Sequence, residues 1–596
     1  MTTTVISTVE TETSPTVFTG GDLLITGTGG VIDTNGTALV FNVSGIVPDV
    51  TINAGAQVYG DDDGIDLNAS QGTGSYPAGA FTIDGSVQGN NFGLLLAGTG
   101  FAEVVIGAQG AVSGGNGAIF IASSDDVITN YGSISSTFNF GVGATTGAAY
   151  VSLTNAGTIT GGVNLEASTG VNYVTNSGLI DGAVILPGSA IVSNSGTIDG
   201  PVVDYGTSGT SLTNSGSIIG QVNFGSSSAV VDTGSISDGV AFGSGSSLLI
   251  GTQGSVTCAD GIGIYAGTNC TITNHGLIGA ASDFIGISEN SDSSAITLTN
   301  TGIIDSGVLF TQSSDDTITN SGTISGGLYL GESDHVYNTG TMLNGVAGDG
   351  KAYIENDGTI SGGINLTAVG RDFVASSGKI SGSVILGQID TLDNSGTVTG
   401  GIVGDGNDGI TNSGIITGGI SDSDTRDTID NQGTITGTIS ETGATLTNSG
   451  AIHGAVDFSG TNTLDNAGTI TGTVTFGGTN DTITNDGTIH GNLDLGVGDV
   501  LNTSTGVVTG EIVAADSDTF DFSGSFGHET IASFVATSNS HDTISFSSND
   551  FANYAAVQAD MVQVGADVVI TLNSGDSIVL LHQTLAHLVS HDFAFT

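Results

Sequence analysis

Apolar residues recur along most of the chain in short segments where an isoleucine, valine or methionine lies two residues after a glycine. Residues 316–326, DTITNSGTISG, are a representative copy. The glycine of this Gly-x-apolar marker recurs in steps that are mostly 17 to 22 residues long. These marker glycines are Gly132, Gly157, Gly178, Gly196, Gly216, Gly234, Gly254, Gly276, Gly302, Gly322, Gly340, Gly358, Gly378, Gly396, Gly414, Gly433, Gly450, Gly468, Gly487 and Gly506. Repetition at this period predicts a solenoid, in which each repeat, or rung, buries its apolar face only against the neighbouring rungs.

Each marker segment has the alternation of a β-strand. Within Gly-Thr-Ile-Thr-Gly the period of two sends the central isoleucine to one face and both threonines to the other. Stacking the rungs in register places one apolar residue per rung in a single buried column, which runs from Ile134 to Val508. A second strand in most rungs repeats the alternation, as in residues 162–165, 220–224 and 472–476. The predicted fold is therefore all-β, a long parallel β-helix (β-solenoid).

An asparagine stands two residues before the marker glycine in most rungs, as Asn194, Asn320 and Asn412 do. Stacked asparagine side chains can hydrogen-bond to the equivalent amides above and below. Asparagine tolerates the left-handed backbone region, and glycine adopts unusual dihedrals without strain. We therefore expect an asparagine ladder at a corner, with the glycine taking the unusual backbone conformation.

The spacing of the marker divides the chain into four parts. Residues 1–50 lack a clear marker and are expected to form an N-terminal cap with strands at residues 23–25 and 38–41, because a first rung would otherwise expose a sheet edge and a bare core. Residues 51–129 hold irregular rungs with inserted loops, one of them at residues 68–78. Residues 130–512 hold the regular solenoid.

Residues 513–596 have a different pattern and are predicted to form a small, mostly β C-terminal domain. Strands are expected within residues 520–526 and 541–546. Residues 567–572 and 577–581 are two further alternating segments, and the NSGD sequence between them predicts a hairpin. A helix is expected over residues 551–561, capped by Asn549 or Asp550 and stopped by Gly565.

Charge makes the predicted solenoid strongly acidic. The 596 residues include 4 Lys and Arg against 58 Asp and Glu, which gives a net charge of −54. Roughly 24 rungs stacked about 4.8 Å apart would span about 110 Å. The charge density would then be about one per 2 Å, comparable to duplex DNA. Such a protein should gather cations and repel nucleic acid and anionic membrane surfaces.

Two further sequence features bear on the compartment. Cys258 and Cys270 lie within one rung, and either a local disulfide or two buried thiols fits their spacing. Residues 1–12 have neither the basic nor the apolar segment of a signal peptide. Export is therefore expected to be directed from elsewhere in the chain.

The end of the chain resembles the C-terminal region of proteins exported by type I secretion, including the RTX family. The resemblance rests on residues 561–572 (MVQVGADVVITL), 575–580 (GDSIVL), 585–588 (LAHL) and 592–595 (DFAF), within residues 515–596. It implies one-step export of an unprocessed chain by a type I secretion machinery, and a secreted, extracellular protein at the cell surface. The tandem calcium-binding nonapeptides of RTX proteins occur here only as fragments, at residues 404–410, 477–483 and 496–500. The rungs themselves are similar to the passenger repeats of bacterial autotransporters.

Aspartates cluster at several predicted loops, and clustered carboxylates supply the hard oxygens that calcium prefers. The candidate calcium ligands are Asp61, Asp62, Asp63, Asp66, Asp315, Asp316, Asp405, Asp408, Asp422, Asp424 and Asp427. The alternative for each cluster is a set of solvated loop carboxylates that bind no ion. The charge of the whole chain favours divalent-cation binding at some of these positions.

The predicted function is that of a non-enzymatic, extracellular structural protein that assembles with itself into a bacterial surface layer or matrix filament. One alternative is an adhesin that binds a surface or a glycan, such as a cell-surface polysaccharide, through the irregular N-terminal rungs. The other is a polysaccharide lyase or epimerase, because such enzymes can use β-helices. That site needs cations to hold an anionic polymer, and the chain offers only Lys351, Arg371, Lys379 and Arg426.

Overall fold

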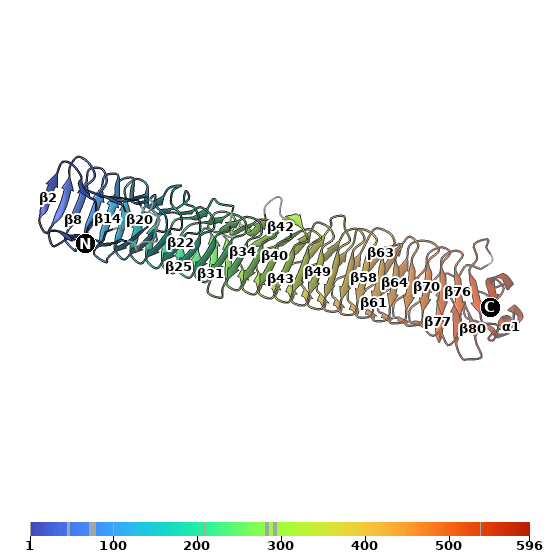
Figure 1. Ribbon diagram of the computed structural model, residues 1–596. Coiled ribbons are helices and arrows are strands. Elements are labelled where there is room, and N and C mark those ends of the chain that lie inside the picture. The colour runs from blue at the N-terminus through green and yellow to red at the C-terminus, as the bar shows by residue number, and fades with distance from the viewer. Residues whose placement is uncertain are drawn as a thin grey trace. The chain divides into compact units, whose positions relative to one another are not determined.

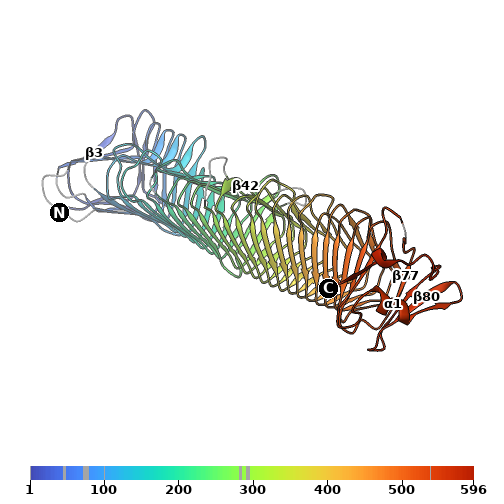
Figure 2. The ribbon, with the colours of Figure 1, turned by 90° about the vertical axis from the view of Figure 1, so that its right-hand side faces the viewer.

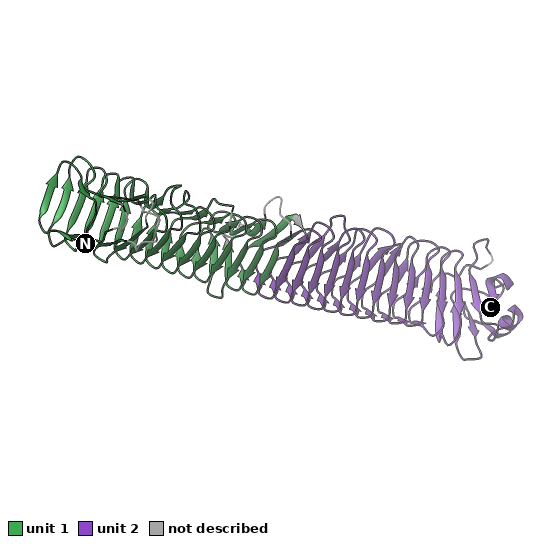
Figure 3. Ribbon diagram, viewed as in Figure 1, with its two compact units in different colours: residues 1–313 green, residues 314–596 purple. Residues whose placement is uncertain are grey.

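The computed structural model is nearly all β and confirms the predicted parallel β-solenoid. Strands hold 52% of the residues, in about 26 rungs, against the roughly 24 expected. The structure describes residues 2–44, 48–70, 79–98, 101–207, 209–280, 285–289, 295–536 and 538–596. Contacts divide the chain into two compact units, Met1–Ser313 and Ser314–Thr596, here called unit 1 and unit 2 (Figure 3). Among the described residues, no helix is long and apolar enough to cross a membrane.

Each regular rung contains three short strands. In unit 2 the first complete rung is β43 (Thr317–Asn320), β44 (Thr323–Ile324) and β45 (Leu328–Glu332), and the next is β46 (His335–Asn338), β47 (Thr341–Met342) and β48 (Val346–Gly348). Equivalent strands of the two rungs pair in parallel, so three parallel sheets line the unit (Figure 1). Sheet A contains β43, β46 and the equivalent strands of the other rungs in either unit. Sheet B contains β44, β47 and their equivalents, and sheet C contains β45, β48 and theirs. Sheet A is an addition to the two strands per rung that the sequence predicts.

Unit 1 has the same three-strand plan from its first residues. The strands expected at residues 23–25 and 38–41 are β4 (Leu23–Ile25) and β6 (Leu39–Ser44). β4 pairs in parallel with β1 (Thr4–Ile6) and with β7 (Val50–Ile52). β6 pairs in the same way with β3 (Thr16–Phe18) and β9 (Ile65–Ser70). Residues 2–44 thus already carry two rungs; most of the expected loop at 68–78 lies outside the described residues.

The predicted apolar column is the core of sheet B. In unit 1, Ile134, Ile159 and Ile180 pair in register in successive strands, and each is fully buried. The intervening residues, such as Thr158 and Thr160, lie on the outer face and are half-buried. Sheets A and C contribute buried columns of their own. Alternation with a period of two therefore produces the core in all three sheets.

The asparagine ladder is confirmed in both units, at the last residue of the sheet A strands. Asn176 Nδ2 donates to Asn194 Oδ1 at 2.8 Å, and Asn194 Nδ2 donates to Asn214 Oδ1 at 2.8 Å. In unit 2, Asn394, Asn412 and Asn431 form the same chain with distances of 2.7 and 2.8 Å. All six side chains are buried. The rungs that carry these asparagines are thus tied to one another by side-chain hydrogen bonds inside the core.

The prediction that the glycine at this corner takes an unusual backbone conformation is wrong. Among the described residues, neither the ladder asparagines nor the marker glycines have positive φ. The glycine is needed for a different reason, because the rungs approach one another closely at this point. A methyl group on Gly196 would lie 2.2 Å from the carbonyl oxygen of Gly178, and one on Gly216 would lie 2.0 Å from that of Gly196. Any side chain would force the stacked rungs apart.

Asn194→Ala is expected to destabilise unit 1 by about 1–3 kcal/mol, because the buried Asn214 Oδ1 loses its donor and Asn176 Nδ2 keeps only its bonds to backbone carbonyl oxygens. Hydrogen exchange of the strands at residues 173–176 and 211–214 should rise, because a solenoid that is destabilised in one rung opens there before the whole unit unfolds. Ser193→Ala is the matched control, because Ser193 is the exposed neighbour on the same strand. Equal exchange in the two variants would contradict a stabilising role for the ladder.

The C-terminal end of unit 2 departs from the three-strand plan (Figure 2). The predicted hairpin is present as β80 (Asp567–Thr571) and β81 (Ser577–Leu580), which pair antiparallel. The predicted helix is shorter than expected, α1 (Tyr554–Asp560). Its cap is Asn553, whose side chain accepts from the backbone N–H of Ala556, and not Asn549 or Asp550. The helix ends before Gly565, which instead lies with φ of 65° between β79 (Met561–Val564) and β80.

Candidate metal centre

A ladder of buried aspartates lies at the corner between sheet C and sheet A. The backbone N–H of each aspartate donates to the carboxylate of the next rung: Asp372 to Asp390, Asp390 to Asp408, and Asp408 to Asp427, each at 2.8 Å. A second run joins Asp481, Asp499, Asp518 and Asp542 with distances of 2.8 to 3.0 Å. All of these aspartates are buried. They are part of the rung-to-rung structure rather than solvated loop carboxylates.

In several rungs the second carboxylate oxygen is also satisfied, by a backbone N–H three residues earlier. Gly387 donates in this way to Asp390 Oδ2 at 2.6 Å, and Gly496 to Asp499 Oδ2 at 2.7 Å. Burial nevertheless raises the pKa of Asp372 to about 6 and that of Asp542 to about 7. Desolvation outweighs the hydrogen bonds because removing a carboxylate from water disfavours its charged form.

Three of the aspartates predicted from the sequence to be calcium ligands come together at this corner in successive rungs. One oxygen from each of Asp408, Asp422 and Asp427 lies within 4.8 Å of the others. Each has already used Oδ1, since Asp390 N donates to Asp408 Oδ1, Asp408 N to Asp427 Oδ1, and Asp424 N to Asp422 Oδ1, all at 2.8 Å. In all three, Oδ2 is buried and has no hydrogen-bond partner.

A fourth carboxylate, Glu441, belongs to the same cluster and was missed from the sequence. It is 2% exposed, and both of its carboxylate oxygens lack hydrogen-bond partners. Burial is the largest cause that raises its pKa to about 9, and the charges of Asp427, Asp422 and Asp408 raise it further. We call Asp408, Asp422, Asp427 and Glu441 the carboxylate cluster.

The strand register explains why the cluster is buried. β57 (Ile402–Val403), β60 (Ile420–Ser421), β63 (Ile439–Thr442) and β66 (Val456–Ser459) are successive strands of sheet C. The inward position after the first apolar residue holds Leu366 and Leu386 in earlier rungs, and Phe458 and Phe476 in later ones. The three rungs between them place Gly404, Asp422 and Glu441 there. The apolar column is thus replaced by two carboxylates and a glycine.

The glycine makes room for the cluster. A methyl group on Gly404 would lie 2.1 Å from Asp422 Oδ2 and 2.8 Å from Asp408 Oδ2. Both unpartnered oxygens therefore occupy the space that a leucine side chain fills in the neighbouring rungs. Burial also raises the pKa of Asp408 to about 7 and that of Asp427 to about 6, with neighbouring aspartates adding to the rise.

The other candidate ligands are not brought together in this way. Asp405 and Asp424 are exposed on the loops outside the cluster. Asp315 is exposed, whereas Asp316 is buried and its backbone N–H donates to Asp334 Oδ1 at 2.9 Å. These residues form no further group of three converging carboxylates or histidines among the described residues.

The N-terminal acidic group is dispersed as well. Asp61 accepts from Asn90 Nδ2 at 3.0 Å, and Asp63 accepts from the backbone N–H of Phe92 at 3.0 Å. Asp62 is exposed, and Asp66 Oδ1 is buried without a partner. Burial raises the pKa of Asp63 to about 6. These four carboxylates do not converge on one point.

The two cysteines are buried free thiols, so of the two alternatives left by the sequence the structure has no disulfide between them. Cys270 Sγ lies 3.3 Å from the carbonyl oxygen of Gly243. Burial raises the pKa of the Cys270 thiol. These features describe an inert core residue rather than a nucleophile.

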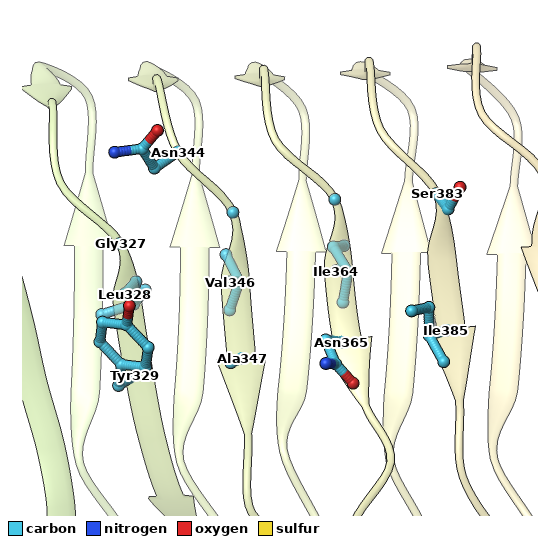
Figure 4. Close-up of a pocket in the computed structure, with 12 residues that line it drawn as sticks. Gly327, Leu328, Tyr329, Asn344, Val346, Ala347, Ile364, Asn365, Ser383 and Ile385 are labelled. Atoms are coloured by element: carbon cyan, nitrogen blue, oxygen red, sulfur yellow. The ribbon is translucent and has the colours of Figure 1, made fainter.

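Open grooves lie on the outer surface of the described residues. One of about 250 Å³ lies beside Gln388, Asn407 and Arg426, and two others are larger. One of these two, of about 390 Å³, runs along sheet C of unit 2, where Tyr329 lies beside Leu328 and the Asn365 amide is two rungs away (Figure 4). The other, of about 290 Å³, lies in unit 1 beside Gln88, Asn90 and Phe138. The Phe138 side chain is 82% exposed. Neither of these two larger grooves is lined by Lys or Arg.

The fold defines the chain as a repeat protein of the parallel β-solenoid class. No model of a protein family and no curated protein matches its sequence.

Proposed function

We propose that the protein is an extracellular structural protein that assembles with itself into a bacterial surface layer or matrix filament, with divalent cations bridging its copies. The observation that carries this proposal is the repetition of one rung, with small polar side chains outside, on a chain of net charge −54. Repetition of this kind favours a building block, because it presents the same surface many times. The proposal includes export through a type I secretion machinery, which rests on the resemblance of the C-terminal segment.

The proposed need for cations in assembly rests on the negative charge of the outer faces. Asp181 and Asp199 are exposed and pair in register on neighbouring strands of sheet B in unit 1, so like charges lie side by side. Among the described residues, the one ion pair joins Lys351 Nζ to Glu332 Oε2 at 3.9 Å. Copies of such a surface repel one another unless cations lie between them. Carboxylates of two copies can share calcium, which accepts several oxygen ligands in a flexible geometry.

Removing calcium should therefore dissolve the assembly. Electron microscopy of the purified chain with calcium is expected to show layers or filaments, and addition of a calcium chelator should return dispersed particles. Sodium chloride at matched ionic strength is the control, since it screens charge without bridging carboxylates. Assemblies that persist in chelator, or that form equally well in sodium chloride alone, would contradict bridging by calcium.

An adhesin is the second candidate, and the groove beside Phe138 favours it. Phe138 is the most exposed of the large hydrophobic side chains in the described chain, and it lies close to the irregular rungs where a contact surface was expected. An exposed aromatic ring beside amide groups suits recognition of a partner surface. Dispersed particles in calcium that bind a polysaccharide would favour this function. A lyase or epimerase is the third candidate, for which the groove beside Arg426 offers a single cationic side chain. Release of unsaturated uronates would test the lyase.

A further inference from the structure

We propose that the carboxylate cluster is an intrachain site for one calcium ion, which ties three consecutive rungs of unit 2 together. The site lies inside a single chain, so it is independent of the proposed assembly of copies. Its ligands come from the corner that precedes β58 (Gly409–Asn412), from the corner between β60 and β61 (Thr428–Asn431), and from β63.

The cluster supplies the oxygens that such an ion needs. Five carboxylate oxygens are buried and lack partners: Oδ2 of Asp408, Asp422 and Asp427, and both oxygens of Glu441. Three Asp ligands with one oxygen each and a bidentate glutamate give five bonds, and water can complete the six to eight that calcium takes. Calcium–oxygen distances of about 2.3–2.6 Å place ligands on opposite sides of the ion at most about 5 Å apart. One oxygen each of Asp408, Asp422 and Asp427 lies within 4.8 Å of the other two, which fits within that limit. Glu441 adds its two oxygens from the strand that pairs with the strand before Asp422.

Burial is the independent reason to assign a ligand here. An acidic cluster at a surface is satisfied by water, but Glu441 is 2% exposed and Asp427 is 2% exposed. Asp372 and Asp481 also leave Oδ2 without a partner, but neither belongs to a group of three converging ligand atoms among the described residues. Within the part of the chain that the structure describes, several such oxygens meet only in the cluster, where Asp422 and Glu441 occupy positions that hold leucine or phenylalanine in the neighbouring rungs.

Calcium fits this site better than other cations. The ligand set consists of carboxylate oxygens without histidine or cysteine, which disfavours zinc and other transition metals. Magnesium requires a near-ideal octahedron at shorter distances and keeps several of its waters. Arg426 lies next to Asp427 in sequence but is exposed and forms no ion pair among the described residues. A side chain of this protein therefore does not supply the counter-charge.

The test measures the local response of the full-length chain to calcium, at a concentration too low for assembly. Hydrogen exchange should fall in residues 402–441 when calcium is added to chelator-treated protein, and regular rungs such as residues 173–218 should change less. Terbium, whose luminescence reports binding in carboxylate sites, should occupy one tight site per chain and be displaced by calcium. The absence of local protection in calcium would overturn the proposal.

Variants separate the site from the surface charge. Glu441→Leu restores the apolar column and should fold without calcium, while the tight site is lost or weakened at least about tenfold. Glu441→Gln should also weaken binding, because an amide is a poorer calcium ligand than a carboxylate. In chelator it should stay as resistant to unfolding as the wild type, because glutamine keeps the size and shape of the glutamate side chain. Asp424→Asn removes one charge from the same loop and is the control, because Asp424 is exposed. Unchanged tight binding in both Glu441 variants, or equal loss in Asp424→Asn, would overturn the proposal. Assembly, scored separately by microscopy, tests the function and not this site.

Discussion

Gly276→Ala is expected to destabilise unit 1 by at least about 3 kcal/mol, or to prevent the surrounding rungs from forming at all. The new methyl group would lie 2.2 Å from the carbonyl oxygen of Gly254 and 2.4 Å from that of Gly251. Both are backbone atoms, so no rotation of a side chain can relieve the clash. The rung of Gly276 would have to move away from the rung of Gly254, which would weaken the hydrogen bond from Leu277 N to Gly254 O, now 3.1 Å long. Thermal unfolding and hydrogen exchange of residues 271–304 measure the effect.

Gly279→Ala is a matched control for this substitution. Gly279 lies three residues further along, in β38 (Leu277–Ala280), and among the described residues a methyl group there would meet only the Thr257 side chain, at 3.6 Å. Its φ is not positive, so alanine fits the backbone without strain. We expect a change within about 0.5 kcal/mol of the wild type. Similar losses in the two variants would show that close packing of the rungs is not why the marker needs glycine.

The sequence was sufficient to predict the fold because each rung repeats the same physical constraints. The alternation around Ile159 or Ile324 selects a buried face, and repetition in register selects a parallel stack. The asparagine ladder follows from the same repetition, since a polar residue at one buried position in every rung can pair only with its own copies. None of these steps requires knowledge of contacts between different parts of the chain.

The reason for the marker glycine could not be predicted with the same certainty. A glycine at a corner usually indicates an unusual dihedral, and sequence alone does not distinguish that from a close approach of two backbones. Gly196 and Gly216 owe their identity to the carbonyl oxygen of the rung below. That contact exists only once the spacing and offset of the rungs are known.

The candidate metal centre was predicted in part. Asp408, Asp422 and Asp427 were selected because they cluster in sequence, and they do lie together. Glu441 lies about one rung away in sequence from Asp427 and carries no local signal. It could have been found by aligning the rungs, since it occupies the position that Phe458 and Phe476 hold in the following rungs. An acidic residue in an apolar column is a stronger signal than several acidic residues in one loop.

The buried carboxylates also imply that acid stabilises unit 2 when divalent cations are absent. Glu529, on β77 (His528–Ala532), is 1% exposed; its Oε1 accepts from the backbone N–H of Val508 at 3.1 Å, and its Oε2 has no partner. Burial raises the pKa of Glu529 from 4.5 to about 8. Between these two pH values the folded chain binds more protons than the unfolded chain, so the free energy of unfolding falls as the pH rises. The contribution of Glu529 to the free energy of unfolding is therefore greatest below pH 4.5, and it is lost progressively as the pH rises to about 8.

Glu529→Gln should remove this part of the pH dependence. The amide resembles the protonated acid and keeps an oxygen that can accept from Val508 N–H, so at pH 8 the variant should be more stable than the wild type by about 2–4 kcal/mol. At pH 4.5 the two should differ little, because the wild-type side chain is then protonated in the folded state. Urea unfolding of the chelator-treated chain at a series of pH values gives both quantities. Glu511→Gln makes the same change at an exposed glutamate, and we expect it to leave the pH profile close to that of the wild type. A wild-type profile that is flat from pH 5 to pH 8, or one that Glu511→Gln alters as much as Glu529→Gln does, would show that Glu529 is not held protonated by its burial.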